Sequence, residues 1–434
     1  MGFAQWSGRV WGRAPFKTKG EIEMRKRTLL IAAFVLAILL AACVGQNDGY
    51  LRNDATVDGV ASGAIAPQGT TVDEVTIGMI APLTGGVSQF GQAVNRGVSL
   101  YIDQFNSLGG LQINVISHDD EGQATAAAVG FERLVDRGVT AIIGSVTSGP
   151  TRAIVPLSYE ANMPMITATA THLNVTVSEE GHVFTNMFRS CFIDPFQGQR
   201  MAEFSQSILG AQTAAVLYSN EIDYSIGLME AFVARAEQLG IEIVEVQRFA
   251  DEALDFRSQL AIIAQSDPDV LFVPAYYRHI GLIGPQSVEI GLPNTTLIGA
   301  DGWATITDFM VDASSVEGAF FLTGFSPEAD DPLVQQFVSD YRARHGEVPN
   351  MFAAQAFDAA KILIAAIEAT IAGTDYLPGS EPFRLALIAN MAATDIYGVT
   401  GRITYDAFNN PEKTAIILQV KDGQEVYWGF FPVE

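Results

Sequence analysis

The sequence predicts an α/β protein with two doubly wound domains, each built on a mainly parallel β-sheet. Two observations carry this prediction. Short apolar strand patterns alternate with amphipathic helix patterns, and the alternation restarts near residue 214 after a first run that begins near residue 75. A chain of 434 residues, 48% hydrophobic and 17% charged, has enough apolar material for two such cores.

The first run begins with a strand pattern and continues with helices that end at glycines. The helix that follows Gln89 ends at Gly109 and a helix at 124–137 ends at Gly138, because glycine accepts the left-handed conformation that terminates helices. The remaining elements are strands at 75–80, 113–117, 140–143 and 165–167 and a helix at 151–160.

The second run repeats the pattern, with strands at 214–218, 241–249, 270–273 and 296–298 and helices at 224–239, 255–265 and 279–290. Ligands bind parallel sheets in the loops that follow the carboxyl ends of the strands. We therefore expect the functional residues in the loops after residues 80, 143, 167, 218, 273 and 298.

Residues 24–42 have the pattern of a secretory signal peptide. Three basic residues follow Met24, and the uncharged apolar run at 29–42 is about 14 residues long, against the ~20 that a transmembrane helix needs. The run ends in Leu-Ala-Ala before Cys43, which resembles a bacterial lipobox, where the cysteine receives a lipid. We expect a lipid anchor at Cys43, a flexible linker over 43–73, and an extracytoplasmic position at a membrane surface, in the periplasm or on the outer face of the cytoplasmic membrane.

Residues 1–23 do not fit a signal peptide, and we expect a misassigned start before Met24. Subtracting the seven Lys/Arg and two Glu of residues 1–42 from the totals of 25 and 49 leaves 18 basic and 47 acidic residues, a net charge of −29. Such a surface repels phosphate backbones, which excludes nucleic acid as a partner.

Cysteine and histidine usage argues against disulfides and metal sites. If Cys43 is acylated, Cys191 stands alone, and we expect it to be a small buried hydrophobic residue. The five histidines are scattered and no Cys/His cluster has metal-ligand spacing, so we expect neither a metal nor a cofactor.

The predicted strand-end loops carry a series of short motifs in a fixed order. The motifs are Ile80-Ala81-Pro82-Leu83-Thr84-Gly85, Ile142-Ile143-Gly144-Ser145, Ile166-Thr167-Ala168-Thr169-Ala170-Thr171, Phe188-Arg189, Gly299-Ala300-Asp301-Gly302 and Tyr397-Gly398-Val399-Thr400-Gly401. Over residues 74–425 the series resembles the leucine/isoleucine/valine-binding proteins of bacterial ABC transporters, which have the type I periplasmic-binding fold. The resemblance implies two lobes joined by a three-strand hinge.

The resemblance implies polar ligand residues on both lobes. Ser148 matches the position that receives a ligand α-carboxylate, and its place before a helix suits an anion, although an ordinary N-cap serine is the alternative. Thr169 and Thr171 match positions that bind the carboxylate and the ammonium group. Asp301 matches the acidic residue that pairs with the ammonium, where the family has Glu or Asp.

Three aromatic residues complete the implied site. Tyr224 and Tyr276 match aromatic residues of the second lobe that cover the ligand on closure, and Phe90 matches a first-lobe contact. The chain departs from the family at two places. Asp119-Asp120 and Thr147 stand where founding members have a disulfide, and Ala168 replaces a proline. We interpret Asp119-Asp120 as a solvated turn.

The resemblance also implies the limits of the lobes and a binding function. The first lobe is expected at 74–192 and 322–397, the second at 193–321 and 398–434, with hinge strands crossing near 192, 321 and 398. A monomer would bind a small amino acid, branched-chain or similar, close on it and deliver it to an ABC permease.

Two alternatives of the same fold remain open: a binder of urea, a short amide or an aromatic acid, and a ligand-sensing partner of a signalling receptor. An enzyme is not expected, because the sequence has no G-x-S-x-G elbow, P-loop or G-x-G-x-x-G motif.

Overall fold

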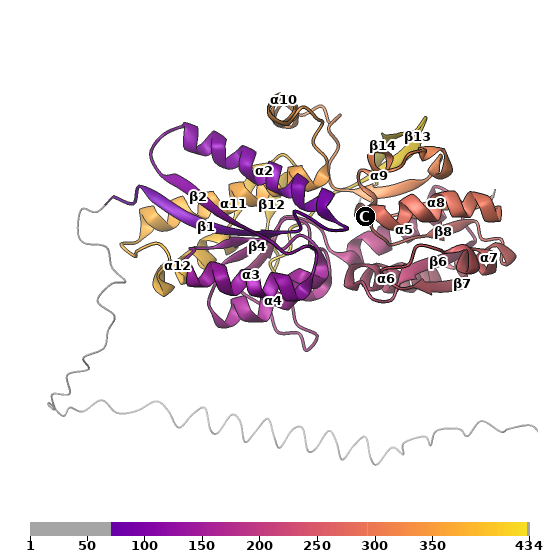
Figure 1. Ribbon diagram of the computed structural model, residues 1–434, viewed down its shortest axis with the longest axis horizontal. Coiled ribbons are helices and arrows are strands. Elements are labelled where there is room, and N and C mark those ends of the chain that lie inside the picture. The colour runs from indigo at the N-terminus through magenta and orange to yellow at the C-terminus, as the bar shows by residue number, and fades with distance from the viewer. Residues whose placement is uncertain (1–70, 293, 432–434) are drawn as a thin grey trace, which may run out of the picture. The chain divides into compact units, whose positions relative to one another are not determined.

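The computed structural model describes residues 71–292 and 294–431, in which a first lobe is built on a five-stranded parallel sheet (Figure 1). The predicted signal peptide and lipid anchor at Cys43 lie outside the described residues. The strand order is β2-β1-β3-β4-β5, with bounds Gln112–Asp119, Glu74–Ala81, Ile142–Ile143, Met165–Thr167 and Met187–Arg189. The helices of this lobe are α2 (Ser88–Ser107), α3 (Ala124–Asp136), α4 (Ser148–Glu160), α10 (Pro332–His345), α11 (Met351–Gly373) and α12 (Glu381–Ala392).

The side chains of β1 show why helices cover both faces of this sheet. Ile77 and Met79 belong to the core that includes α2 and α11, whereas Ile80 points to the opposite core, which includes α3 and α4. Successive side chains of a strand point to opposite faces, so a strand apolar on both faces requires two helical layers.

The second lobe is built on a seven-stranded mixed sheet. Its order is β14-β13-β10-β9-β8-β6-β7, with bounds Gln424–Phe431, Ala415–Lys421, Phe320–Thr323, Thr296–Gly299, Val270–Phe272, Thr213–Ser219 and Glu242–Phe249. The helices are α5 (Asp194–Ser207), α6 (Asp223–Leu239), α7 (Arg257–Gln265), α8 (Tyr277–Ile290) and α9 (Ile306–Phe309), with short 3₁₀ turns at Asp301–Trp303 and Ala313–Val316. A further 3₁₀ turn, Leu173–Val175, lies between β4 and β5 of the first lobe. Strands β6 to β10 are parallel, while β13 and β14 are antiparallel additions. The predicted fold class, two α/β lobes with mainly parallel sheets, is confirmed.

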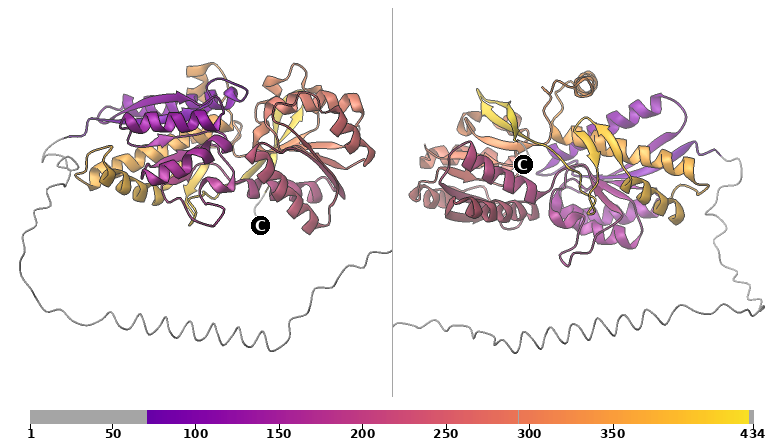
Figure 2. Two further views of the ribbon diagram at one scale, coloured as in Figure 1. Left: turned by 60° about the horizontal axis from the view of Figure 1, so that its bottom comes forward. Right: turned by 180° about the vertical axis from the view of Figure 1, so that it is seen from behind.

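Three segments connect the lobes. The first lies between β5 and α5, and the second between β10 and α10. The third differs from the expected crossing near 398. The hairpin of β11 (Asp395–Gly398) and β12 (Gly401–Thr404) stays with the first lobe (Figure 2), because Asp358 of α11 accepts hydrogen bonds from the N–H groups of Val399 and Thr400 at 2.8 and 2.9 Å.

Asn409 extends this attachment, since its side chain donates a hydrogen bond to the carbonyl of Met187 at 3.0 Å. The next strand, β13, begins at Ala415 in the second sheet. The third crossing therefore lies at 411–414, after the boundary that the resemblance implies. None of the described helices combines the length and hydropathy needed to span a membrane.

Candidate functional site

A small cavity lies where loops of both lobes meet. Six of the seven predicted ligand residues line it: Phe90, Ser148, Thr169, Tyr224, Tyr276 and Asp301. The other lining residues are Val146, Thr147, Gly302 and Phe352. Thr171 is not among them. The lining side chains are almost fully buried, with Phe90 and Asp301 only 1% and 2% exposed, so the two lobes enclose the cavity.

Ser148 is the first residue of α4, one position after an extended Thr147. The backbone N–H groups of a first helical turn lack partners inside the helix, and the helix dipole adds a partial positive charge. The hydroxyl of Ser148 accepts a hydrogen bond from the N–H of His172 at 3.3 Å, which ties α4 to the loop after β4. This corner of the cavity thus favours an anionic group.

Thr169 and Thr171, which follow β4, differ in the hydrogen-bonding capacity that remains free for a ligand. The hydroxyl of Thr169 donates to the carbonyl of Val146 at 2.7 Å, and its N–H donates to Thr167 Oγ1 at 3.3 Å. A hydroxyl has one proton, so Thr169 has only acceptor capacity left, which suits an ammonium group. Thr171 has a buried Oγ1 without a partner among the described residues, and its carbonyl accepts from the N–H of Asp194 at 2.9 Å.

Asp301 contributes a buried carboxylate from the second lobe. It begins the short turn after β9, and Oδ1 accepts a hydrogen bond from the Tyr224 hydroxyl at 2.7 Å. That hydroxyl also accepts from the N–H of Gly302 at 2.7 Å, while the N–H of Asp301 donates to the side chain of Gln197 at 3.1 Å. Burial raises the pKa of Asp301 to about 6, although the hydrogen bond from the Tyr224 hydroxyl opposes this shift.

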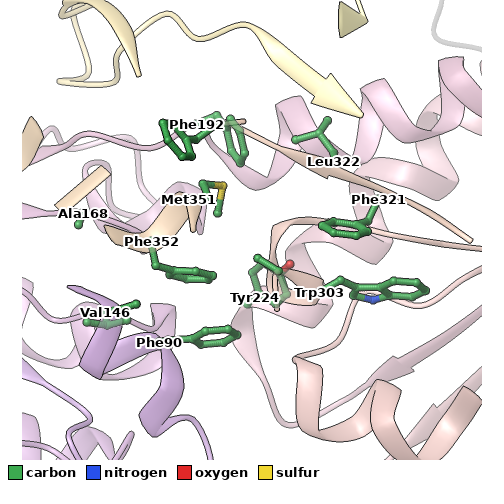
Figure 3. Close-up of a cluster of buried hydrophobic side chains, with 14 of the residues drawn as sticks. Phe90, Val146, Ala168, Phe192, Tyr224, Trp303, Phe321, Leu322, Met351 and Phe352 are labelled. Atoms are coloured by element: carbon green, nitrogen blue, oxygen red, sulfur yellow. The ribbon is translucent and has the colours of Figure 1, made fainter. Parts of the chain in front are cut away.

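Aromatic side chains line part of the cavity, and Figure 3 shows the rings of Phe90, Phe352 and Tyr224 lying close together. Phe90 stacks on Phe352 with centroids 4.2 Å apart, and its edge-on contacts with Tyr276 and Tyr277 have centroid distances of 5.5 and 4.8 Å. Tyr224 stacks on Tyr276 at 4.9 Å. Because Phe90 belongs to the first lobe and both neighbouring tyrosines to the second, these contacts join the lobes directly at the site.

Polar contacts between the lobes lie at the mouth of the cavity. Arg152 of α4 forms an ion pair with Asp223 of α6 at 2.8 Å. The hydroxyl of Tyr277 accepts from the N–H of Gln89 at 3.4 Å and donates to the carbonyl of Gly86 at 3.2 Å. Gly86 and Asp223 also line a second, more open hollow of about 260 Å³, and Thr147 and Tyr276 line both spaces.

Sequence reasoning missed some lining residues and misjudged one acidic pair. Phe352 lies on α11, far from the predicted strand-end loops, and no local signal separates it from an ordinary core residue. The interpretation of Asp119-Asp120 as a solvated turn is wrong for Asp120, which is fully buried and accepts hydrogen bonds from Ser145 and Gly122. Cys191 is a free, buried cysteine as predicted. Within the described ranges, no group of three or more His, Cys, Asp or Glu side chains could hold a metal ion.

Comparison with known proteins agrees with this architecture. A family model described as "Periplasmic binding protein" matches residues 74–425, most of the chain. The chain belongs to the periplasmic binding protein family. This is a family of solute-binding proteins, and its two-lobed type I fold is the one found here.

Several known proteins resemble this periplasmic binding protein over most of its length. The Leu/Ile/Val-binding protein BraC3 of Rhizobium johnstonii is 28% identical over 358 residues, 81% of this chain and 94% of the relative. The leucine-binding protein LivK of Thermotoga maritima is 31% identical, with a TM-score of 0.74, and the match covers 82% of this chain and 98% of LivK. LivJ of Streptococcus pneumoniae, solved with isoleucine, is 27% identical with a TM-score of 0.72 over 82% of this chain and 99% of LivJ.

A solute-binding protein of Rhodopseudomonas palustris, solved with benzoate, is 23% identical with a TM-score of 0.73 over 82% of this chain and 96% of that one. At this identity the likeness concerns the fold alone.

Proposed function

We propose that this periplasmic binding protein binds a small zwitterionic amino acid, branched-chain or similar, in the cavity between its lobes and presents it to an ABC permease. The observation that carries the proposal is the placement of opposite polarity on opposite lobes. The first lobe offers Ser148 and the N-terminus of α4 to a carboxylate, and the second offers Asp301 to an ammonium group. Only a closed molecule satisfies both ends, so ligand binding favours closure.

Thr169 and Thr171 are proposed to complete the two ends. The spare acceptors of Thr169 suit the ammonium, and the unpartnered hydroxyl of Thr171 suits the carboxylate. Phe90, Tyr224 and Tyr276 are proposed to enclose the apolar part of the ligand, as the stacking of the wall supports. Leucine- and isoleucine-binding relatives support the same class of ligand.

An aromatic acid is the second candidate, because the wall formed by Phe90 and Phe352 would stack on a ring. An acid without an ammonium group would, however, leave the buried Asp301 carboxylate without a cation, which costs several kcal/mol. The amino acid is therefore favoured. Urea or a short amide is a weaker proposal, because neither carries both a carboxylate and an ammonium group. A role as a sensing partner would use the same site and stays the alternative to transport.

The localisation proposal rests on the sequence before residue 71. We propose secretion through the signal at 24–42, a lipid anchor at Cys43 and action of a monomer outside the cytoplasm. Fatty-acid labelling of the expressed protein tests the anchor: the label is expected in the wild type and absent from Cys43→Ser. Labelling that persists in the variant would place the lipid elsewhere.

A thermal-shift screen tests the ligand. The twenty amino acids, urea, acetamide and benzoate are each added at millimolar concentration to the mature protein, since a ligand at 100 times its Kd stabilises by ~2.7 kcal/mol. We expect one group of uncharged-side-chain amino acids to raise the melting temperature, with a smaller shift from their decarboxylated amines at equal concentration. Stabilisation by benzoate or urea without any amino acid would overturn the proposal.

A further inference from the structure

Arg189, the last residue of β5, is a fully buried cation whose bonds go mainly to one loop. Nη1 donates to the carbonyl of Ala170 at 3.0 Å, and Nη2 donates to the carbonyl of His172 and to Thr176 Oγ1, each at 3.1 Å. In the described ranges, no ion pair within 4.0 Å involves this guanidinium. A buried charge is costly unless its donors are matched, so the loop carbonyls are what make this cation tolerable.

The loop that Arg189 holds is residues 168–173, here called the site loop, which carries both threonines of the proposed site. Its contact with α4 is the bond from the N–H of His172 to Ser148 Oγ. The guanidinium donates hydrogen bonds to the carbonyls of Ala170 and His172, which lie on either side of Thr171. Arg189 therefore fixes the backbone at the position proposed to receive the carboxylate.

The direction of the Thr171 N–H follows from peptide geometry. A trans peptide unit is planar, so its C=O and N–H point in opposite directions. Because the carbonyl of Ala170 points at Arg189, the N–H of Thr171 points away from it. Among residues 71–292 and 294–431 this N–H donates no hydrogen bond. The buried Thr171 hydroxyl also makes none with normal geometry, although it lies close to the buried carboxylate of Asp194. Buried donors of this kind usually have a partner, which a bound anion would supply.

We propose that Arg189 is a positioning residue for the ligand carboxylate: its guanidinium holds the site loop so that the N–H and hydroxyl of Thr171 stay available to an anion. The inference rests on the proposed function. The positive charge also polarises the Ala170–Thr171 peptide and strengthens its N–H as a donor. Lysine would keep the charge but lose the planar fork that reaches several oxygens at once.

Titrations of Arg189→Met and Arg189→Lys with L-leucine and with 3-methylbutan-1-amine, which lacks only the carboxylate, test the proposal. For Arg189→Met, the affinity for leucine should fall by about tenfold or more, the scale of a lost charge-assisted contact. The affinity for the amine should change by less than about threefold, because the amine has no carboxylate for the site loop to bind. Arg189→Lys should recover part of the leucine affinity.

Arg384→Met is the matched control. This arginine also donates only to carbonyls, those of Gly379 and Ala161, but at a place outside the cavity lining. The Arg384→Met variant should bind leucine and 3-methylbutan-1-amine with unchanged affinities. If Arg189→Met does not fold, Thr176→Val removes a single acceptor of the guanidinium and should still lower leucine binding selectively.

Equal losses of leucine and amine binding in the Arg189 variants would show that the residue only supports the fold, and unchanged leucine affinity would equally overturn the proposal. Failure of the wild-type protein to bind leucine or any other amino acid would instead remove the proposed function, before any variant is compared.

Discussion

The phenolic hydroxyl of Tyr224 donates a hydrogen bond to Oδ1 of Asp301 at 2.7 Å and accepts one from the N–H of Gly302. The hydroxyl is thereby committed to the carboxylate and the turn, and the ring of Tyr224 is what faces the cavity. Tyr224 thus fixes the orientation of the acidic group that the proposed ammonium must meet.

Asp301→Ala should lower amino-acid affinity by about tenfold or more, because a buried ammonium left without its partner costs several kcal/mol. The melting temperature of the ligand-free protein should stay nearly unchanged, since the substitution also removes a carboxylate that burial disfavours. Calorimetric titration with L-leucine measures the first effect and thermal melting the second. Glu237→Ala, at an exposed position of α6, is the control. Wild-type affinity in the Asp301 variant would remove this residue from the site.

Amino-acid affinity should depend on pH through Asp301, whose pKa is raised by burial from 3.8 to about 6. An ammonium partner favours the ionised carboxylate, so below pH 6 binding must displace a proton. Affinity should be flat above about pH 7 and fall by up to about tenfold per unit below pH 6. Titrations from pH 5 to pH 8 measure the profile, and Asp301→Asn should flatten it. A wild-type profile without this fall would contradict the role.

The raised pKa of Asp301 also determines whether the stability of the folded protein rises or falls with pH. The folded protein holds the Asp301 proton more tightly than the unfolded chain, so the contribution of this group is present at low pH. It should be lost as the pH rises from about 4 to about 6. Denaturant midpoints of the wild type compared with Asp301→Asn over this range isolate the contribution, and an opposite slope would exclude it.

Gly302→Ala should weaken binding by displacing the Tyr224 hydroxyl from Asp301. A Cβ at this position would lie 2.8 Å from the Tyr224 hydroxyl and 3.0 Å from the carbonyl of Ala275, so the tyrosine must move away from Asp301. We expect a loss of leucine affinity of about threefold to thirtyfold, the range of one disturbed charge-assisted hydrogen bond. Gly373→Ala, where an added Cβ meets nothing within 4 Å, should bind as the wild type does. Equal affinities for both variants would show that the Tyr224 contact is unimportant.

Arg152→Ala should speed ligand release, because Arg152 and Asp223 join the lobes at the mouth of the cavity. Both side chains are partly exposed, and exposed ion pairs contribute ~0.2–1 kcal/mol, so the release rate should rise by less than about fivefold and the difference should shrink in high salt. Stopped-flow release of leucine measures the rate. Arg257→Ala removes ion pairs made within the second lobe and should leave the release rate unchanged. A faster rate in both variants would point to a general charge effect.

Much of the fold could be predicted because its strands and helices have regular apolar periodicity. The strand at 165–167 and the helix at 124–137 agree with β4 and α3 to within one residue. The start of α4 was placed three residues late, because Ser148-Gly149-Pro150 has the composition of a loop although Ser148 already begins the helix. The elements after residue 300 were not predicted individually.

The site was predictable where it follows strand ends and not elsewhere. Asp301 and Thr169 come from loops after strands, where parallel sheets place ligands. Phe352 reaches the cavity from a helix through tertiary packing, which no local pattern encodes. The third lobe crossing was also missed, because the hydrogen bonds from Val399 and Thr400 to Asp358 span more than forty positions in sequence.

A crystal structure of the mature protein grown with L-leucine, or with the amino acid selected by the screen, tests the central claim most directly. We expect the carboxylate of the bound molecule at the N-terminus of α4, beside Ser148, and its ammonium group within hydrogen-bonding distance of Asp301. A ligand that touches only one lobe, or that lies outside the enclosed space between Phe90 and Tyr276, would contradict the claim that two hinged halves recognise the two ends of a zwitterion.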